Sequence, residues 1–382
     1  MENKKTYRDI GEEQARENPL IPSWLEGAEI AVALKKLRRH RLALAGGLIL
    51  CVFYAVSIFA DFVAPYNYDD EARENSFNPP TPVHWVDSSG GALKIRPYVY
   101  PDAIRFDEFY RRVYVPDTTK KCAVRFLVRG YEYRLLGVFK TDVHLFGVDP
   151  GARIYLLGAD GRGRDYFSRI VHGSRVSLSI GIIGSLLTFF AGLIVGGVAG
   201  YYGGRTDTAI MRLCEMMMLL PGFYMMLALR AAFPPNLSSV KVYILIVLIF
   251  SFIGWAGLAR IIRGMVLSLK EKEFVLAARA AGRCGFGIII KHILPNTFSF
   301  VIVSMTLSIP GYILGESALS LIGLGIQDPY ASWGNLLGEA MNIAELKFHP
   351  WVLSSGVCIF LTVMAFNFFG DGLRDAFDPK TD

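Results

Sequence analysis

The chain has 382 residues, of which 52% are hydrophobic and only 19% are charged, with a formal net charge of +6. Soluble domains average about a quarter charged residues, so this composition indicates long apolar segments rather than an ordinary core. The five cysteines are all at least 70 residues apart along the chain, which excludes a disulfide framework and a zinc cluster.

Six segments have the length and apolar character of membrane spans. A helix needs about 20 apolar residues to cross about 30 Å of hydrocarbon. The third segment is the weakest because it contains Arg212, Glu215 and Arg230, and a buried helix is the alternative there; Arg212 and Glu215 also predict a local ion pair. We predict an all-α polytopic membrane protein with six transmembrane helices, at residues 42–64, 176–202, 208–233, 242–262, 297–326 and 351–370.

The distribution of basic residues predicts the orientation of these spans. Lysine and arginine concentrate before the first span and between the fourth and fifth. Such clusters mark cytoplasmic segments. Residues 1–41 are therefore predicted to be a cytoplasmic N-terminal segment, the C-terminus is also cytoplasmic, and residues 65–175 are extracytoplasmic. The net charge is interpreted as this orientation signal and not as a nucleic-acid surface.

Residues 65–157 form a predicted extracytoplasmic insert that is rich in β-structure. Period-2 alternation with glycine between the halves predicts one hairpin around residues 88–91 and a second around Arg129 and Gly130. His84 and His144 have no partner at metal-ligand spacing, so we interpret them as ordinary hairpin residues.

The motifs of common catalytic sites are missing from the sequence. It contains no phosphate-binding P-loop, no His-Glu-x-x-His and no Gly-x-Ser-x-Gly. We predict no catalytic, cofactor-binding or metal-binding residues, and hence no enzyme activity in this chain. Energy for uphill transport would come from a partner or an ion gradient.

The loop at residues 263–296 has features of a docking segment. Ser268 to Glu271 has the form of a capping box, which predicts a helix start. Glu273, Ala277, Ala278 and Ala281 share one helical face of small residues, and Gly282 predicts the helix end. Such a face fits a groove on another protein, although alanine-rich surface helices are also common.

This loop resembles the "EAA" loop of ABC importer permeases, in which a glutamate, two alanines, a glycine and a distal Leu-Pro recur. Other parts of the chain are similar to the second, C-type permease subunit of dipeptide, oligopeptide and nickel importers. The resemblance covers the first span and residues 157–380, whereas residues 68–150 are much longer than the corresponding segment usually is. The similar blocks lie at residues 157–165, 168–169, 173–175, 200–204, 207, 316–325, 332–334 and 367–379.

The resemblance implies the type I ABC importer fold, with residues 158–382 as a five-helix permease core around the coupling loop at residues 263–296. It also implies a bacterial inner-membrane location, a homologous second permease subunit forming a heterodimer, two ATPase subunits that bind ATP and Mg, and an extracytoplasmic solute-binding protein. Peptides are the expected solute, with oligosaccharides and nickel or other metal chelates as alternatives. The residues implied in ATPase coupling are Glu273, Ala277, Ala278, Arg279, Gly282, Leu294 and Pro295.

The fifth predicted span contains candidate residues of the translocation path or gate. Pro310 and Gly311 predict a broken or kinked helix, and Glu316 and Ser317 follow within the span. A carboxylate inside a membrane is costly, so Glu316 should face a partner or a wet path. Glycines at four-residue spacing in the second span indicate close helix packing, either inside the subunit or at a dimer face. An ion-coupled secondary transporter remains the alternative class.

Overall fold

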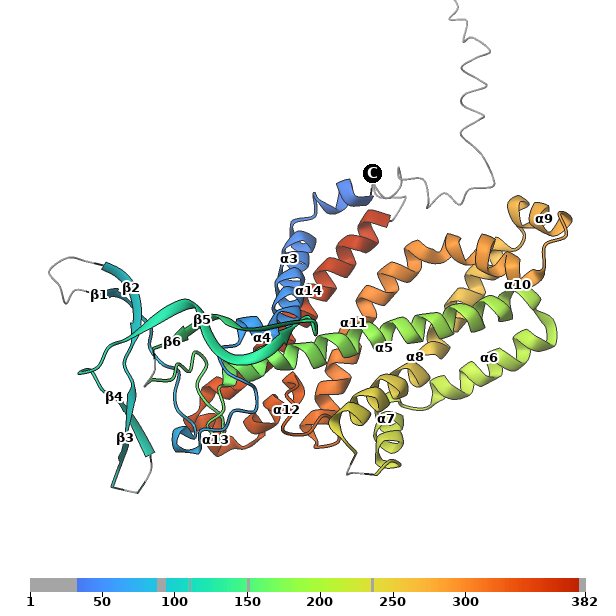
Figure 1. Cartoon of the computed structure of the whole chain (residues 1–382). Helices are drawn as coiled ribbons and strands as arrows, with labels where there is room; N and C mark the ends of the chain where they lie inside the picture. The colour runs from blue at the N-terminus through green and yellow to red at the C-terminus, as the bar shows by residue number, and fades with distance from the viewer. Residues whose placement is uncertain are drawn as a thin grey trace, which may run out of the picture.

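The computed structural model describes residues 33–87, 94–108, 110, 112–149, 152–234 and 237–377. Within them the chain forms a bundle of helices with a smaller group of strands at one end (Figure 1). Most of the predicted N-terminal segment and the turn predicted at residues 88–91 lie outside these ranges.

Five helical segments of the described chain are long and apolar enough to cross a membrane. Three are single helices: α3 (Arg41–Ile58), α5 (Tyr166–Tyr202) and α8 (Ser239–Leu269). The fourth, Gly285–Leu321, joins α10 (Gly285–Ile288), the π-helical η3 (Ile289–Ile293), η4 (Leu294–Thr297) and α11 (Phe298–Leu321). The fifth, Pro350–Phe377, joins η6 (Pro350–Leu353) to α14 (Ser354–Phe377).

The first predicted span ends earlier than expected. The helix α3 stops at Ile58, and a separate short helix, α4 (Ala60–Val63), follows it.

The third predicted span is broken rather than straight. It consists of α6 (Gly204–Leu219) and α7 (Gly222–Ala231), whose axes differ by 86°. Pro221 lies at the break; it lacks a backbone N–H and disfavours helical backbone in the residue before it, and Leu220 is indeed extended. The predicted ion pair is confirmed, since Arg212 Nη1 lies 3.0 Å from Glu215 Oε2.

Small residues allow the long helix α5 to pack closely against α8. A Cβ atom on Gly196 would lie 2.4 Å from the Ala259 carbonyl oxygen, and one on Gly200 would lie 2.8 Å from that of Arg263. These glycines therefore allow close helix packing inside the subunit, which was one of the two predicted roles; the other was packing at a dimer face. On the other side of the bundle α3 packs against α14, and α11 contacts both α5 and α14.

The residues between α4 and α5 contain the strands. A four-stranded antiparallel sheet has the order β1-β2-β5-β6, and β3 pairs with β4 in a separate two-stranded sheet. The first predicted hairpin corresponds to the pairing of β1 with β2. The strands are β1 (His84–Asp87), β2 (Lys94–Val99), β3 (Asp102–Phe106), β4 (Arg112–Pro116), β5 (Cys122–Leu135) and β6 (Phe139–Val148), preceded by η2 (Arg73–Asn75).

The second predicted hairpin is wrong. Strand β5 continues through Arg129 and Gly130 without turning and pairs with β6 as far as Leu135 opposite Phe139. The glycine serves a contact instead of a turn, because a Cβ atom there would lie 2.6 Å from the His144 ring. The chain reverses only after Leu135.

Short helices close the same end of the bundle as the strands. They are α12 (Trp333–Gly338), η5 (Glu339–Met341) and α13 (Ile343–Phe348). Ser332 and Asn335 form a capping box that starts α12, and Trp333 is buried in the core formed by α3, α5, α11 and α14.

Candidate functional site

The predicted docking helix is α9 (Glu273–Ala280), at the end of the bundle away from the strands (Figure 1). It starts later than the capping-box pattern predicted, because α8 runs through Ser268 and ends at Leu269. Lys272 precedes the first turn and makes no side-chain cap. Glu273 places a carboxylate at the positive end of the helix dipole, which stabilises that start.

Gly282 ends α9 as predicted. The Gly282 N–H donates to the Arg279 carbonyl and the Arg283 N–H donates to the Ala278 carbonyl, which is the Schellman pattern. The φ angle of Gly282 is +74°, a conformation that L residues with a Cβ rarely adopt. No atom of the described chain lies within 4 Å of where its Cβ would be, so the space beside this glycine is open.

One face of α9 is anchored in the bundle. Val275 and Ala278 are buried in a core with side chains of α8 and the following segment, among them Ile262, Val266 and Ile288. The prediction that Ala278 lies on the free face is therefore wrong, because its direction is fixed by this tertiary contact. The anchoring packs α9 into the same core as α8 and α11.

The opposite face of α9 is exposed and consists mostly of small side chains. We call it the α9 face; Leu276 on it is 44% exposed. Its members are Glu273, Leu276, Ala277, Ala280 and Ala281. A flat face of alanines carrying one carboxylate and one leucine allows a second protein to approach the backbone closely.

The remaining predicted coupling residues support the helix from outside the α9 face. The guanidinium of Arg279 lies over the Tyr201 ring, 5.5 Å from its centroid. Pro295 is buried in η4, and Leu294 packs into the same core as Val275. These three residues position α9 and its neighbours.

The candidate path residues lie on α11, which continues through Pro310 without ending. Gly311 is exposed and has open space beside it. Glu316 is fully buried; Ser177 on α5 donates to its Oε2 at 3.2 Å and Ser320 donates to its Oε1 at 2.7 Å. Ser317 is buried as well. Glu316 therefore links two helices, and it makes no ion pair with any described residue.

A cluster of buried charges at the N-terminal end of α5 is a feature that the sequence did not reveal as a unit. Arg164 Nε lies 2.7 Å from Asp160 Oδ2, and Arg169 Nη2 lies 2.8 Å from Asp328 Oδ1. Arg164 also reaches Asp328 at 3.2 Å. Asp160 is fully buried and both arginines are 2% exposed. The cluster joins the start of α5 to the loop after α11.

Glu339 lies beside this cluster and should make stability depend on pH. Burial, and secondly the carboxylate of Asp160, raise the pKa of Glu339 to about 7. Unfolded glutamate titrates near about 4.3, so between these values the folded chain keeps a proton that the unfolded chain has released. This contribution to stability is complete below about pH 4 and is lost as pH rises towards about 7.

We therefore expect Glu339→Gln to remove the pH-dependent contribution of this side chain to the stability of the fold. The apparent melting temperature of the natural chain, relative to the variant, should fall between about pH 4 and about pH 7. The check is thermal unfolding of both purified chains in one detergent across this range. A constant difference between the two melting temperatures would contradict the assignment.

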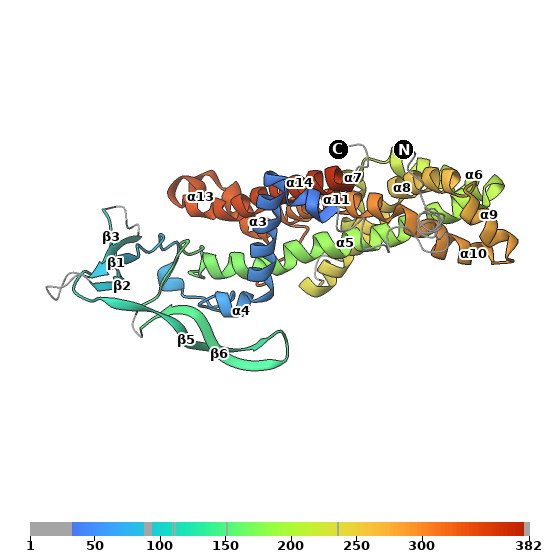
Figure 2. The same ribbon diagram turned by 90° about the horizontal axis from the view of Figure 1, so that it is seen from above.

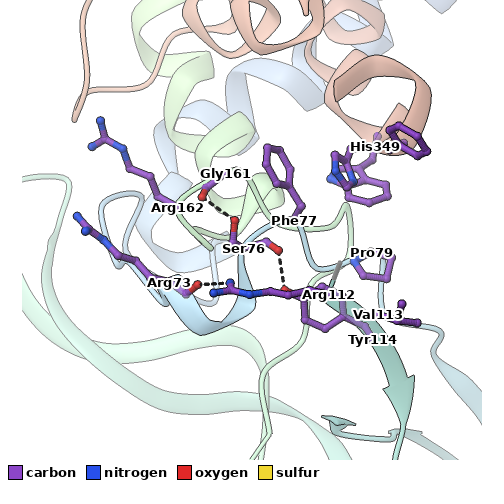
Figure 3. Close-up of a pocket in the computed structure, with 12 residues that line it drawn as sticks. Arg73, Ser76, Phe77, Pro79, Arg112, Val113, Tyr114, Gly161, Arg162 and His349 are labelled. Atoms are coloured by element: carbon purple, nitrogen blue, oxygen red, sulfur yellow. Dashed lines mark hydrogen bonds between the residues drawn. The ribbon is translucent and has the colours of Figure 1, made fainter. Parts of the chain in front are cut away.

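A cavity of about 1100 Å³ lies between the strands and the helices. Ser76 donates to the Gly161 carbonyl at 2.7 Å and Arg112 donates to the Arg73 carbonyl at 2.8 Å. Both bonds are drawn in Figure 3, and they join the segments around the cavity. Its lining combines arginines with aromatic rings: Arg73, Arg112, Arg162, Phe77, Tyr114, His349 and Trp351. In the described part of the chain no group of His, Cys, Asp or Glu is arranged to hold a metal ion.

Comparisons with known proteins give consistent matches. Residues 192–382 match the family model described as "Binding-protein-dependent transport system inner membrane component", and residues 30–80 match "N-terminal TM domain of oligopeptide transport permease C". The dipeptide transport system permease protein of Bacillus subtilis is 43% identical over 232 residues, 60% of this chain and 70% of that protein. The oligopeptide transport system permease protein of Haemophilus influenzae is 42% identical over 242 residues, 63% of this chain and 75% of its own length.

A further match reaches across the insert. The dipeptide transport system permease protein of Lactococcus lactis subsp. cremoris is 29% identical over 349 residues, 91% of this chain and 90% of that protein. A match of that length includes much of residues 65–157. This relative therefore has a comparable segment there, whereas the matches to the Bacillus subtilis and Haemophilus influenzae permeases cover only 60% and 63% of this chain.

Proposed function

The chain belongs to the family of binding-protein-dependent transport system inner membrane components, and from that premise we propose that it carries peptides across the membrane. Family membership makes it a C-type permease subunit of an ABC importer, a multi-pass inner-membrane protein and not an enzyme. The relatives carry the names of dipeptide, oligopeptide and glutathione permeases, which supports peptides as the solute class.

The α9 face is proposed as the docking surface for an ATPase subunit. The observation that carries this proposal is the combination of an exposed face of small residues with an opposite face anchored by Val275 and Ala278. A displacement of α9 by a docked partner would be transmitted to α8 and α11, because side chains of the three helices share one packed core. ATP and Mg are proposed to bind to two such partner subunits. Closure of that pair would then tilt the spans between inward-facing and outward-facing states.

The other half of the translocation path is proposed to come from a homologous permease subunit, in a heterodimer. The proposed topology places both chain ends in the cytoplasm. Its support is that His40 Nε2, just before α3, lies 3.7 Å from Asp375 Oδ2 near the end of α14, so these two helix ends share one side. The strands, at the opposite end of the bundle, are then extracytoplasmic (Figure 1).

The insert is proposed to cover the outer gate and to meet the solute-binding protein. Its support is the cavity in Figure 3, whose wall is shared between residues of the insert, such as Arg112 and Tyr114, and residues of the core, such as His349. A solute released at this end of the bundle would pass this wall.

The function is tested by uptake of labelled dipeptide and oligopeptide in cells with and without the gene for this chain. We expect loss of uptake on deletion, recovery on complementation, and competition by unlabelled peptide. Competition only by an oligosaccharide or by a nickel chelate would reject the peptide assignment while leaving the permease class intact.

Substitutions at Glu316 test whether the charge of this carboxylate is needed for transport. Glutamine keeps the size of the side chain and one acceptor for the serine hydroxyls, so we expect Glu316→Gln to retain uptake. Glu316→Leu removes both acceptors, leaves Ser177 and Ser320 without this partner, and should lower the amount of folded chain. Initial rates of peptide uptake, normalised to chain in the membrane, provide the check. Complete loss of transport in the glutamine variant would contradict a structural role and would mean that transport requires the carboxylate itself.

A further inference from the structure

The β5–β6 hairpin folds back along the helices rather than away from them. Figures 1 and 2 both show it beside α4. The ring of Phe146 lies 5.9 Å from that of Phe167 in the first turn of α5, and Tyr131 Oη lies 3.4 Å from His172 Nε2 in the second. The hairpin therefore runs in the same direction as α5, towards the interior of the membrane.

The base of the hairpin is fixed to the end of the first span. The ring nitrogens of His144, which is 1% exposed, lie 2.9 Å from the Ala64 carbonyl oxygen and 3.0 Å from that of Tyr131. The ring of Tyr133 lies 5.0 Å from the ring of His144, so this tyrosine lies near Ala64, just after α4.

The last charged pair of the neighbouring helices lies at the same level. Arg175 Nη2 is 2.7 Å from Asp61 Oδ2, and Arg175 Nε donates to the Ser57 carbonyl. Beyond it, residues 176–202 of α5 contain no charged side chain. From Tyr133 to the turn the strand advances three residues, about 10 Å at about 3.3 Å per residue. Because the hairpin runs in the same direction as α5, the tip lies level with the uncharged part of α5.

The tip is apolar and exposed, with a pair of cations behind it. Leu136 is 58% exposed, Val138 72% and Phe139 66%. Directly behind them Arg134 pairs across the strands with Lys140, and both side chains are exposed. Apolar residues followed by cations on long flexible stems suit the boundary between acyl chains and phosphate headgroups.

The turn itself is unusual for a hairpin in water. Leu136 and Gly137 have φ angles of 52° and 75°, and the Val138 N–H donates to the Leu135 carbonyl, which is the pattern of a type I′ turn. The first of these positions favours Asn, Asp or Gly, which tolerate positive φ and stay hydrated. Exposure of an apolar leucine side chain to water at this position is unfavourable, whereas its transfer into lipid is favourable.

We propose that the tip of the β5–β6 hairpin, residues 135–139, inserts into the lipid leaflet on the insert's side of the membrane, with Arg134 and Lys140 at anionic headgroups. Lipid is the occupant because the exposed apolar tip lies level with the uncharged part of a spanning helix and because its cations match phosphate. The proposal rests on family membership for the presence of a membrane, and on the proposed topology only for which leaflet it is.

The test uses the full-length chain, with its five cysteines replaced, in phosphatidylglycerol-containing nanodiscs without any partner protein. An environment-sensitive fluorophore is attached at Phe139→Cys or, as the matched control, at Phe106→Cys. Phe106 is 64% exposed, almost the same as Phe139, but lies on the β3–β4 sheet, which points away from the helices (Figure 1).

We expect the label at position 139 to emit at shorter wavelength, to be quenched by spin-labelled lipid and to be shielded from iodide, with the reverse at position 106. Equal iodide quenching at both positions would overturn the proposal. Shielding from iodide without quenching by lipid would also overturn it, because the cover would then be protein.

A second variant keeps the turn intact while changing its solvent preference. Leu136→Asn suits a type I′ turn better than leucine does, so the hairpin should still form. In the Phe139→Cys background it should shift the label towards water, with longer-wavelength emission and restored iodide quenching. An unchanged label would contradict insertion. Peptide uptake by the assembled importer is measured in parallel, so a failed peptide assignment is distinguishable from a failed lipid contact.

Discussion

Replacing Gly282 by tryptophan is expected to abolish peptide uptake while the chain stays in the membrane. The substitution places a large side chain at the open end of α9 and forces positive φ on a residue with a Cβ atom, at a local cost of roughly 1–2 kcal/mol. That cost is too small to remove an anchored helix from its core. A docking partner on the α9 face would, however, meet the indole directly, and each ~1.4 kcal/mol of lost docking energy weakens association tenfold.

Two controls separate bulk from backbone strain. Gly282→Asn tolerates positive φ without the bulk and should retain most uptake. Gly323 has a φ of +79° and equally open surroundings, but it lies at the other end of α11, so Gly323→Trp should not affect ATPase binding. The measurement is co-purification of the ATPase with the tagged chain, together with initial uptake rates. ATPase retention and normal uptake in Gly282→Trp would reject the coupling role of α9.

Replacing Asp160 by alanine is expected to cause the largest loss of stability of any single change considered. The substitution leaves Arg164 and Arg169, each 2% exposed, with Asp328 as their remaining carboxylate. Removing one partner of a buried ion pair costs about 3–5 kcal/mol because a buried charge is left uncompensated. The effect should spread to both segments joined by the cluster, the start of α5 and the loop after α11.

An exposed ion pair of the same type provides the control. Asp142 lies 3.9 Å from Arg129 on the surface of the β5–β6 hairpin, and exposed pairs contribute about 0–1 kcal/mol. Asp142→Ala should therefore leave the apparent melting temperature almost unchanged in detergent, whereas Asp160→Ala should lower it strongly. Similar shifts in the two variants would mean that the buried cluster does not stabilise the fold as its geometry indicates.

The spans could be predicted from the sequence because hydrophobic length is a local property. The end of α9 at Gly282 was also predictable, since a glycine after an alanine run is a local signal for positive φ. The 86° bend in the third segment was not predicted, although Pro221 and Gly222 are visible in the sequence, because hydropathy averages over the break.

Tertiary contacts explain the remaining errors. Val275 and Ala278 turn α9 so that Leu276 and Ala280, rather than Ala278, face outward, and this rotation depends on where the core of α8 and α11 lies. Gly130 looked like a turn residue but serves a close contact with His144. The pairing of Arg169 with Asp328 joins residues 159 positions apart, a separation at which periodicity carries no information.

The most direct test of the central claim, that an ATPase docks on the α9 face, is photo-crosslinking from a single position in the assembled importer. A benzophenone amino acid is placed at Leu276 on the α9 face or at Leu213 on α6, which are 44% and 45% exposed. Light should produce an adduct between this chain and the ATPase subunit from position 276 and none from position 213. An intact complex that gives no ATPase adduct from position 276, or equal adducts from both positions, would contradict the claim.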